Sequence, residues 1–253
     1  MDRYLKIKAY FSSTYRMQEQ QIPYDLSSHP IQVLIISNTH DTGRPLPFLP
    51  YRSKNASRLE GILPKNAVTT ICCSDATSDD MQSITKQFLS KVEDVAKGGN
   101  PVVTLFYFSG YGTRLDDDAD QAVLCGTDHN EKNFFRARPY RLLFDYIHPV
   151  SRFPGVHMLL MDCAGIETGV HFSFMMPRLE ARFHALYTTD DQMGSHKTGT
   201  SPLTETWCSL VRAKPSSIED LSKAVRISMV SQAPYLNAHE CSTLYNHFTF
   251  PGL

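Results

Sequence analysis

Four short, mostly apolar runs place the tightest limit on the fold of this chain. They span residues 31–36, 67–73, 102–108 and 156–161. The run at 102–108 is apolar on both faces, as a central strand of a parallel sheet must be when helices cover it from either side. The runs therefore predict the strands of a sheet that is buried between helices.

Segments with helical spacing alternate with these runs. We expect helices over 53–63, 78–97, 140–147, 203–211 and 218–231, and further strands over 121–125, 183–187 and 243–250. Strands that alternate with helices are typical of an α/β protein with a mostly parallel sheet and helices on both faces. Residues 1–30 are expected to be an N-terminal extension of a single domain that spans 31–253.

Composition excludes several kinds of partner. The 25 basic and 26 acidic side chains leave a net charge of −1, too little to attract nucleic acid or an anionic membrane. The first six residues lack the apolar core of a secretion signal, and no apolar stretch approaches the ~20 residues that span a bilayer. Six cysteines in a chain of this size favour free thiols in a reducing compartment. We expect a soluble cytoplasmic protein.

Two of the predicted strand ends carry residues that could form a site. Ser109-Gly110-Tyr111-Gly112 follows the third run, and Asp162-Cys163-Ala164-Gly165 follows the fourth. In open parallel sheets, ligands gather beyond the carboxyl ends of the strands. The glycines beside Tyr111 would permit a tight turn that points its side chain into a cleft. An ordinary strand exit bracketed by glycines explains the same residues.

Taken in order, these segments resemble a known family. Residues 106–112, 123–128 and 157–164 are similar to the corresponding segments of the caspase-like cysteine proteases, and most similar to the paracaspase and metacaspase branch. The resemblance covers residues 31–250. It implies a caspase-like fold with a mostly parallel six-stranded sheet, a large-subunit-like part at 31–165 and a small-subunit-like part at 182–253.

The departures from the family pattern bear directly on catalysis. The family places a general-base histidine where this chain has Tyr111, and a nucleophilic cysteine where it has Ala164, 53 residues later. A methyl group has no proton to lose, and a tyrosine with a pKa of ~10 is protonated at neutral pH. The sequence therefore predicts a pseudoprotease. Cys163 is the fallback nucleophile, but strand alternation should turn it to the opposite face as a small buried hydrophobe.

Asp162 matches a family position with a defined role. The resemblance implies that its carboxylate lines a substrate-binding pocket for a basic residue, to which Asp190 and Asp191 are only roughly placed to contribute. A buried carboxylate can equally be satisfied by an internal arginine or by backbone amides. The sequence leaves both interpretations open.

No cofactor or metal is expected. The acidic run at 116–120 could bind calcium, but it lacks the twelve-residue loop of a known calcium motif, so a solvated loop is favoured. The histidines show no zinc spacing, and neither a Walker loop nor a dinucleotide fingerprint is present.

Three functions are therefore weighed. The first is an inactive scaffold or regulator that binds an active protease relative or a signalling adaptor, with a homodimer formed through the predicted 243–250 edge strand. The second is a cysteine endopeptidase cleaving after Arg or Lys, with Cys163 as nucleophile or with Ala164 standing in place of a native cysteine. The third is a doubly wound binding domain unrelated to proteases.

Overall fold

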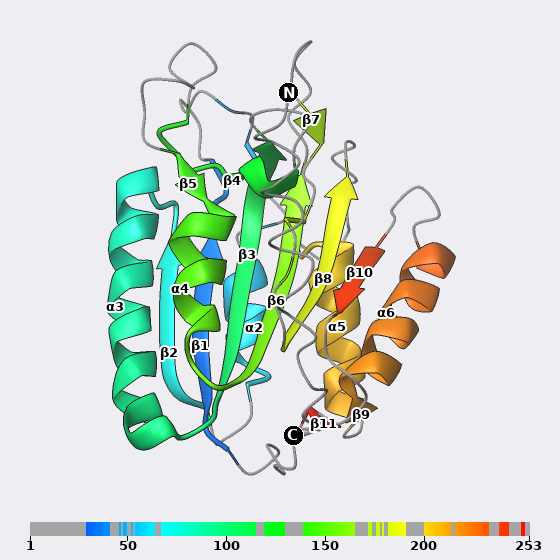
Figure 1. Ribbon diagram of the computed structural model, residues 1–253. Helices are drawn as coiled ribbons and strands as arrows, with labels where there is room; N and C mark the ends of the chain where they lie inside the picture. The colour runs from blue at the N-terminus through cyan, green and yellow to red at the C-terminus, as the bar shows by residue number, and fades with distance from the viewer. Residues whose placement is uncertain are drawn as a thin grey trace, which may run out of the picture.

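A single main sheet organises the chain (Figure 1). The computed structural model describes residues 29–40, 46, 48–49, 52, 54–63, 67–114, 119–129, 139–164, 172–173, 176–177, 179, 182–190, 200–213, 216–232, 238–242 and 249–250. Six strands lie side by side in the order β10-β8-β6-β3-β1-β2. Their bounds are β1 (Ile31–Ser37), β2 (Ala67–Ser74), β3 (Val102–Arg114), β6 (Gly155–Ala164), β8 (Phe183–Asp190) and β10 (Ala238–Ser242).

The strand directions agree with the predicted α/β class. Every neighbouring pair from β2 to β8 is parallel, and only β10 runs antiparallel to its neighbour β8. Three short strands extend this sheet beside the far end of β3: β4 (Ala122–Leu124), β5 (Tyr140–Arg141) and β7 (Phe172–Ser173). The mostly parallel sheet with helices on both faces is confirmed.

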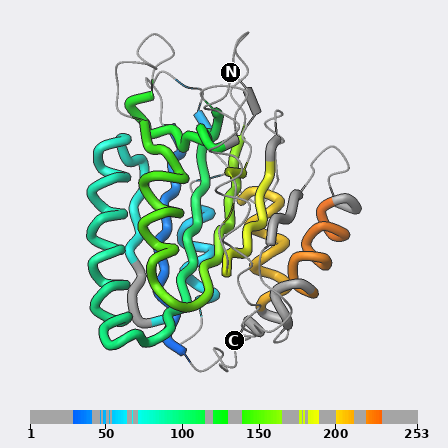
Figure 2. The backbone as a smooth tube through the Cα atoms, in the orientation of Figure 1, coloured from blue at the N-terminus to red at the C-terminus, as the bar shows by residue number. Residues whose placement is uncertain are grey.

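Helices cover both faces of the sheet, as Figures 1 and 2 show. One face carries α3 (Ser78–Ala96), the short 3₁₀ turn η3 (Lys97–Gly99), η6 (Leu143–Ile147) and α4 (His148–Ser151), and a 3₁₀ turn η4 (Ala119–Gln121) precedes β4. The other face carries α2 (Asn55–Glu60), α5 (Pro202–Ala213) and α6 (Ile218–Gln232). We name these the α3 face and the α5 face.

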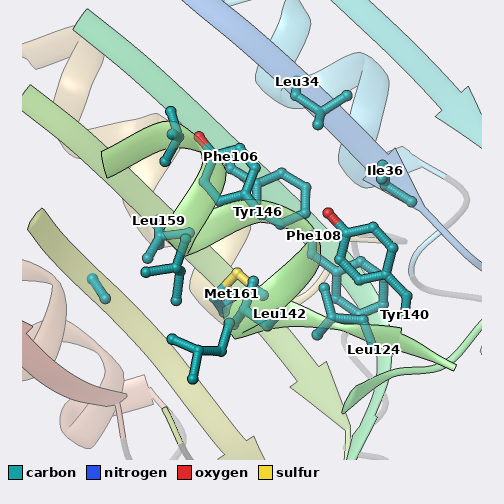
Figure 3. Packing of buried hydrophobic residues seen from close by; sticks show 14 of the residues in the cluster. Leu34, Ile36, Phe106, Phe108, Leu124, Tyr140, Leu142, Tyr146, Leu159 and Met161 are labelled. Carbon is teal, nitrogen blue, oxygen red and sulfur yellow. The ribbon is translucent and has the colours of Figure 1, made fainter. Parts of the chain in front are cut away.

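Alternation along each strand divides the core between the two faces. In β1, Leu34 and Ile36 pack on the α3 face, whereas Val33 and Ile35 pack on the α5 face. On the α3 face the rings of Phe106 and Tyr146 lie 4.5 Å apart, with Tyr140 beside them (Figure 3). Each such buried side chain stabilises the fold by about 1.5–3 kcal/mol. This double burial explains why the central runs read as apolar on both sides.

Helix α3 begins at Ser78, as the sequence predicted, and the residue before it forms the cap. Thr77 is the N-cap: its hydroxyl oxygen accepts from the Asp80 amide at 3.2 Å, and the Asp80 carboxylate accepts from the Thr77 amide at 3.1 Å. This reciprocal capping box satisfies two helix-end donors. The Thr77 hydroxyl also donates to Asp80 Oδ2 at 2.6 Å, and this bond, together with the one from the Thr77 amide, lowers the pKa of Asp80.

The helix expected over residues 140–147 is only partly correct. Tyr140 and Arg141 form β5, because their backbones pair with Leu124 and Val123 of β4. The helical segment starts after them as η6, a π-helical turn, and continues into α4. The Asp145 carboxylate accepts a hydrogen bond from the Arg141 amide at 2.7 Å, which satisfies a backbone donor just before η6.

The predicted edge strand at 243–250 is also displaced. Of the two described edge strands of the main sheet, β2 and β10, the one from the C-terminal part of the chain is β10, at residues 238–242. Thr249 and Phe250 form β11 (Thr249–Phe250), which pairs with β9 (Ser216–Ser217) in a separate two-stranded sheet. Residues 243–248 lie outside the described residues. The apolar pattern of the last segment did not distinguish the two pairings.

Two buried histidines should make the fold sensitive to acid. Burial lowers the pKa of His157 and of His184 to about 4, below the unfolded value of about 6.5. Between these pH values the unfolded chain binds protons that the folded chain does not. The contribution of the two histidines to the free energy of unfolding is therefore fully present above about pH 6.5 and is lost as the pH falls to about 4. Each histidine can contribute up to about 3 kcal/mol to this loss.

Urea unfolding from neutral pH down to pH about 4 measures this loss. His157→Gln should flatten the pH dependence, whereas replacement of the exposed His148 by glutamine should leave its shape unchanged. A wild-type stability that stays level across the acid range would contradict the assignment.

Candidate functional site

The two segments that were predicted to follow the ends of strands belong to the strands themselves. β3 runs on through Gly110 and Gly112 to Arg114, and β6 runs on to Ala164. The predicted turn at Tyr111 is therefore wrong: β6 pairs with β3 as far as Tyr111, β4 pairs with it from Gly112, and these partners keep the backbone extended. Tyr111 lies directly opposite Ala164 in this register.

Tyr111 and Ala164 belong to a small apolar cluster of their own. Its described members, which we call the Tyr111 cluster, are Leu46, Leu49, Tyr111, Cys125 and Ala164. Tyr111 is 2% exposed and Ala164 is 5% exposed. The His40 ring meets the Tyr111 ring edge-on, with 5.0 Å between ring centroids. The positions that the sequence singled out are brought together, and both side chains are buried.

The loops that follow β1, β2 and β4 hold this cluster in place. The Asn38 side chain donates to the Cys125 carbonyl at 3.1 Å, and the Cys125 amide donates to the Tyr111 carbonyl at 2.9 Å. The Asp75 carboxylate accepts from the amides of Thr39 at 2.7 Å and His40 at 3.2 Å. Asp75 and His40 both have positive φ, at 53° and 54°, a conformation that surrounding bonds must stabilise in non-glycine residues.

Cys163 lies on the other side of the sheet. It is fully buried in the hydrophobic cluster of the α3 face, whereas its neighbours Asp162 and Ala164 contact groups on the α5 side of the strand and in the Tyr111 cluster. Burial raises the pKa of the Cys163 thiol well above its usual range. Strand alternation thus continues to the end of β6, and the thiol stays protonated away from Tyr111.

Asp162 is buried and bound by residues of the same chain. Its side chain is 4% exposed, and its Oδ1 lies 3.0 Å from Nη1 of Arg52, whose side chain is 9% exposed. Nη1 of Arg52 also donates to the Asp162 carbonyl and, at 3.0 Å, to the Ser109 hydroxyl. Because Ser109 and Asp162 are paired across β3 and β6, the two strands offer their acceptors side by side.

Neutral donors complete the surroundings of the Asp162 carboxylate. Its Oδ2 accepts from Asn55 Nδ2 at 3.2 Å, from Thr204 Oγ1 at 2.9 Å, and from the Ser201 hydroxyl. The Ser201 amide in turn donates to Asn55 Oδ1 at 2.9 Å, which links the start of α2 to the start of α5. Asp162 therefore has an internal arginine, Arg52, as its charged partner in the structure.

Several residues of this network were not found from the sequence. Arg52 lies in an irregular proline-rich stretch, and Asn55, Ser201 and Thr204 are residue types that are common at helix starts. Their role depends on contacts between residues that lie from 39 to 146 positions apart along the chain. The spacing of polar residues carries no sign of such contacts.

Other predicted site residues give no support for a metal site. The segment 115–118 and Asp191 lie outside the described residues, and Asp190 pairs by its backbone with Ala164 at the end of β8. Among the described residues, no three His, Cys, Asp or Glu side chains gather as metal ligands.

No helix within the described ranges has the length and apolar character needed to cross a bilayer.

Comparison with known proteins agrees with this architecture. A family model described as "Caspase domain" matches residues 32–247. A solved structure described as pro-sf-caspase-1 is similar with a TM-score of 0.59 and 13% identity, covering 92% of this chain and all of the other. At that identity the likeness shows the fold alone. No curated protein matches the chain.

The family match spans the parallel sheet, the helices of both faces and the two strand ends. It overturns the third function that was weighed, a doubly wound domain unrelated to proteases. The chain belongs to the caspase-domain family.

Proposed function

We propose that this protein is a catalytically inactive member of its family that acts by binding other proteins. The observation that carries the proposal is the opposition of Tyr111 and Ala164 on β3 and β6. In the family pattern these positions hold the base and the nucleophile. Peptide hydrolysis by this family needs a thiolate and a neighbouring base, and a phenol facing a methyl group provides neither.

Burial adds a second obstacle to catalysis. A substrate carbonyl would have to reach Ala164, which is 5% exposed and packed among Leu46, Leu49 and Cys125. Burial also raises the pKa of the Cys125 thiol above its usual range, so that the sulfur of this cluster is no substitute nucleophile. Both the chemistry and the access support an inactive site.

The paracaspase and metacaspase branch remains our preferred placement within the family. It is supported by Asp162, two residues before Ala164, and by the Ser-Gly-Tyr-Gly end of the third run. The internal bond between Asp162 and Arg52 weighs against binding of basic residues at Asp162 in this chain.

The alternative of an active endopeptidase rests on Cys163, and the geometry weighs against it. The thiol is fully buried on the α3 face, with no base from the Tyr111 cluster on its side of the sheet. If Ala164 replaces a native cysteine, the base position is still occupied by Tyr111, and the site is still closed by Leu46 and Leu49.

Thiol alkylation distinguishes a buried Cys163 from a catalytic one. Iodoacetamide at mildly alkaline pH should modify the exposed Cys72 of the folded chain first, and should leave the buried Cys125, Cys163 and Cys208 unmodified. The same three cysteines should react once the chain is unfolded, which is the internal control. Peptide mass spectrometry that finds Cys163 modified as fast as Cys72 would favour the endopeptidase.

The partner is proposed to be an active protease relative or a signalling adaptor in the cytoplasm. The test adds the purified chain to a purified active caspase-domain protease and follows hydrolysis of a fluorogenic peptide. We expect the hydrolysis rate of the protease to change saturably with the amount of chain, unlike its response to an equal mass of an unrelated globular protein. An unchanged rate, together with no complex by light scattering, would count against a role in regulating such relatives.

A homodimer through a sheet edge is the second binding mode. The edge strand from the C-terminal part of the chain is β10, so we move the dimer proposed from residues 243–250 to residues 238–242. In an antiparallel strand, successive amides point alternately to the partner strand and outward. Of His239→Pro and Glu240→Pro, only the variant that removes an outward amide should abolish a dimer while preserving the fold. A wild-type mass that stays monomeric at every concentration in light scattering would sink the dimer.

A further inference from the structure

The outer edge of β2 is open among the described residues. In the main sheet β2 pairs with β1, and no described strand lies on its other side. The Asp75 amide, just after β2, donates to the Ser37 carbonyl of β1 at 3.1 Å. Because backbone groups alternate in direction along a strand, those of Cys72 and Ser74 point away from β1. They form a row with which another strand can pair.

The β2 edge lacks the features by which sheets usually block a further strand. Charged residues and prolines protect most exposed edges, and residues 67–74 include neither. The one irregularity in register with β1 lies at the start of β2, and the pairing from Thr69 to Ser74 is regular. The other edge strand, β10, carries Glu240. The β2 edge is therefore the less protected of the two.

Helix α3 presents a patterned flank beside the same edge. It follows β2 directly and packs back along it at the margin of the molecule (Figure 1). Gln82 donates to the Pro139 carbonyl at 3.4 Å, and Glu93 lies 3.9 Å from Arg152, so this flank of the helix faces β5 and α4. Four residues at helical spacing lie on the opposite flank, toward the β2 edge, and we call them the α3 stripe: Asp80, Ile84, Gln87 and Lys91.

The α3 stripe is complementary to an antiparallel copy of itself. Asp80, Gln87 and Lys91 are exposed, and Ile84 is half-buried. The acid lies near the carboxyl end of β2, and the base lies about three helical turns later. A two-fold axis that pairs β2 with a second β2 makes the two α3 helices run in opposite directions. Asp80 of each copy then faces Lys91 of the other, with the two Ile84 side chains between them.

We propose that the β2 edge is a homodimer interface, in which β2 pairs antiparallel with β2 of a second copy and the two α3 stripes meet across the two-fold axis. This goes beyond the proposed function, whose dimer uses β10. A second copy fits the edge better than an extended peptide does, since a peptide would pair with β2 and leave the charges of α3 unmatched. Strand pairing supplies the contact, and the charges select the orientation.

Charge reversal on α3 tests the interface. Light scattering of the wild type at increasing concentration should approach twice the chain mass of 28.6 kDa. Lys91→Glu places like charges beside Asp80 at both symmetry-related contacts, and should raise the dissociation constant about tenfold. Lys86→Glu is the matched control, because Lys86 is exposed on the other flank of the same helix. It should dimerise as the wild type does.

Cross-linking and a proline substitution locate the contact on β2. Cys72 is exposed, so a bifunctional maleimide should join two wild-type chains. It should also join two Cys241→Ser chains, which lack the thiol of β10, whereas Cys72→Ser should lose most of the product. Cys72→Pro removes an outward amide and no hydrogen bond to β1. This variant should stay monomeric and keep the circular dichroism of the wild type.

A wild type that stays monomeric at every concentration overturns the proposal. A dimer that survives Lys91→Glu and Cys72→Pro but is lost with a proline in β10 also overturns it, because the contact then lies at the opposite edge. If Cys72→Pro does not fold, the comparison of Lys91→Glu with Lys86→Glu decides, since both change exposed helix positions. None of these results bears on the Tyr111 and Ala164 pair, whose inactivity is measured by hydrolysis.

Discussion

Replacing Asp162 with alanine is expected to lower the free energy of unfolding by about 3–5 kcal/mol. The change leaves the buried Arg52 guanidinium, 3.0 Å from the lost carboxylate, without its counter-charge. It also removes the acceptor of Asn55, Ser201 and Thr204 in one step. An uncompensated buried charge is far less stable than a paired one, which makes the loss large.

The control is a more exposed ion pair of the same chain. Arg58 and Glu205 meet at 2.8 Å, but their side chains are 31% and 25% exposed, so Glu205→Ala should lower stability by only about 1 kcal/mol or less. Denaturant unfolding of both variants gives the comparison. Equal losses for Asp162→Ala and Glu205→Ala would mean that the network around Asp162 does not stabilise the site as described.

Gly155→Ala is expected to have an effect of similar size for a different reason. Gly155 starts β6 with φ at +136°, and a Cβ added there would lie 1.9 Å from the Val102 carbonyl oxygen. The conformation alone disfavours a side chain by about 1–3 kcal/mol, and the backbone contact requires β3 and β6 to move apart. We expect a loss of about 4 kcal/mol or failure to fold.

Gly98→Ala is the matched control for this prediction. Gly98 also has positive φ, at +81°, but no atom lies within 4 Å of its added Cβ. Only the conformational penalty applies, so this variant should lose about 1 kcal/mol and remain folded. Thermal unfolding of the two variants measures the difference. A Gly155→Ala chain as stable as Gly98→Ala would contradict the close approach of β6 to β3.

Much of the fold was predictable because its signals are local. The apolar runs at β1, β3 and β6 are buried on both faces, and alternation assigns Val33 and Leu34 to opposite sides. Helix α3 shows its cap, its apolar stripe and its glycine end within one continuous stretch. These features depend on residues a few positions apart, which periodicity can detect.

The site was less predictable because its geometry depends on distant partners. The glycines around Tyr111 suggested a turn, yet pairing with β4 and β6 extends β3 through them. The partner of Asp162 could not be chosen from the sequence, because Arg52 gives no periodic signal. Burial of Cys163 followed from simple alternation. What the sequence did identify was the pair itself, Tyr111 and Ala164.

The most direct measurement is hydrolysis by the purified chain. Fluorogenic peptides ending in Arg, Lys or Asp are incubated with the chain and with its Cys163→Ala variant. The closed, phenol-and-methyl arrangement on β3 and β6 predicts that both release fluorophore no faster than buffer. Turnover by the chain that disappears in Cys163→Ala would contradict the account.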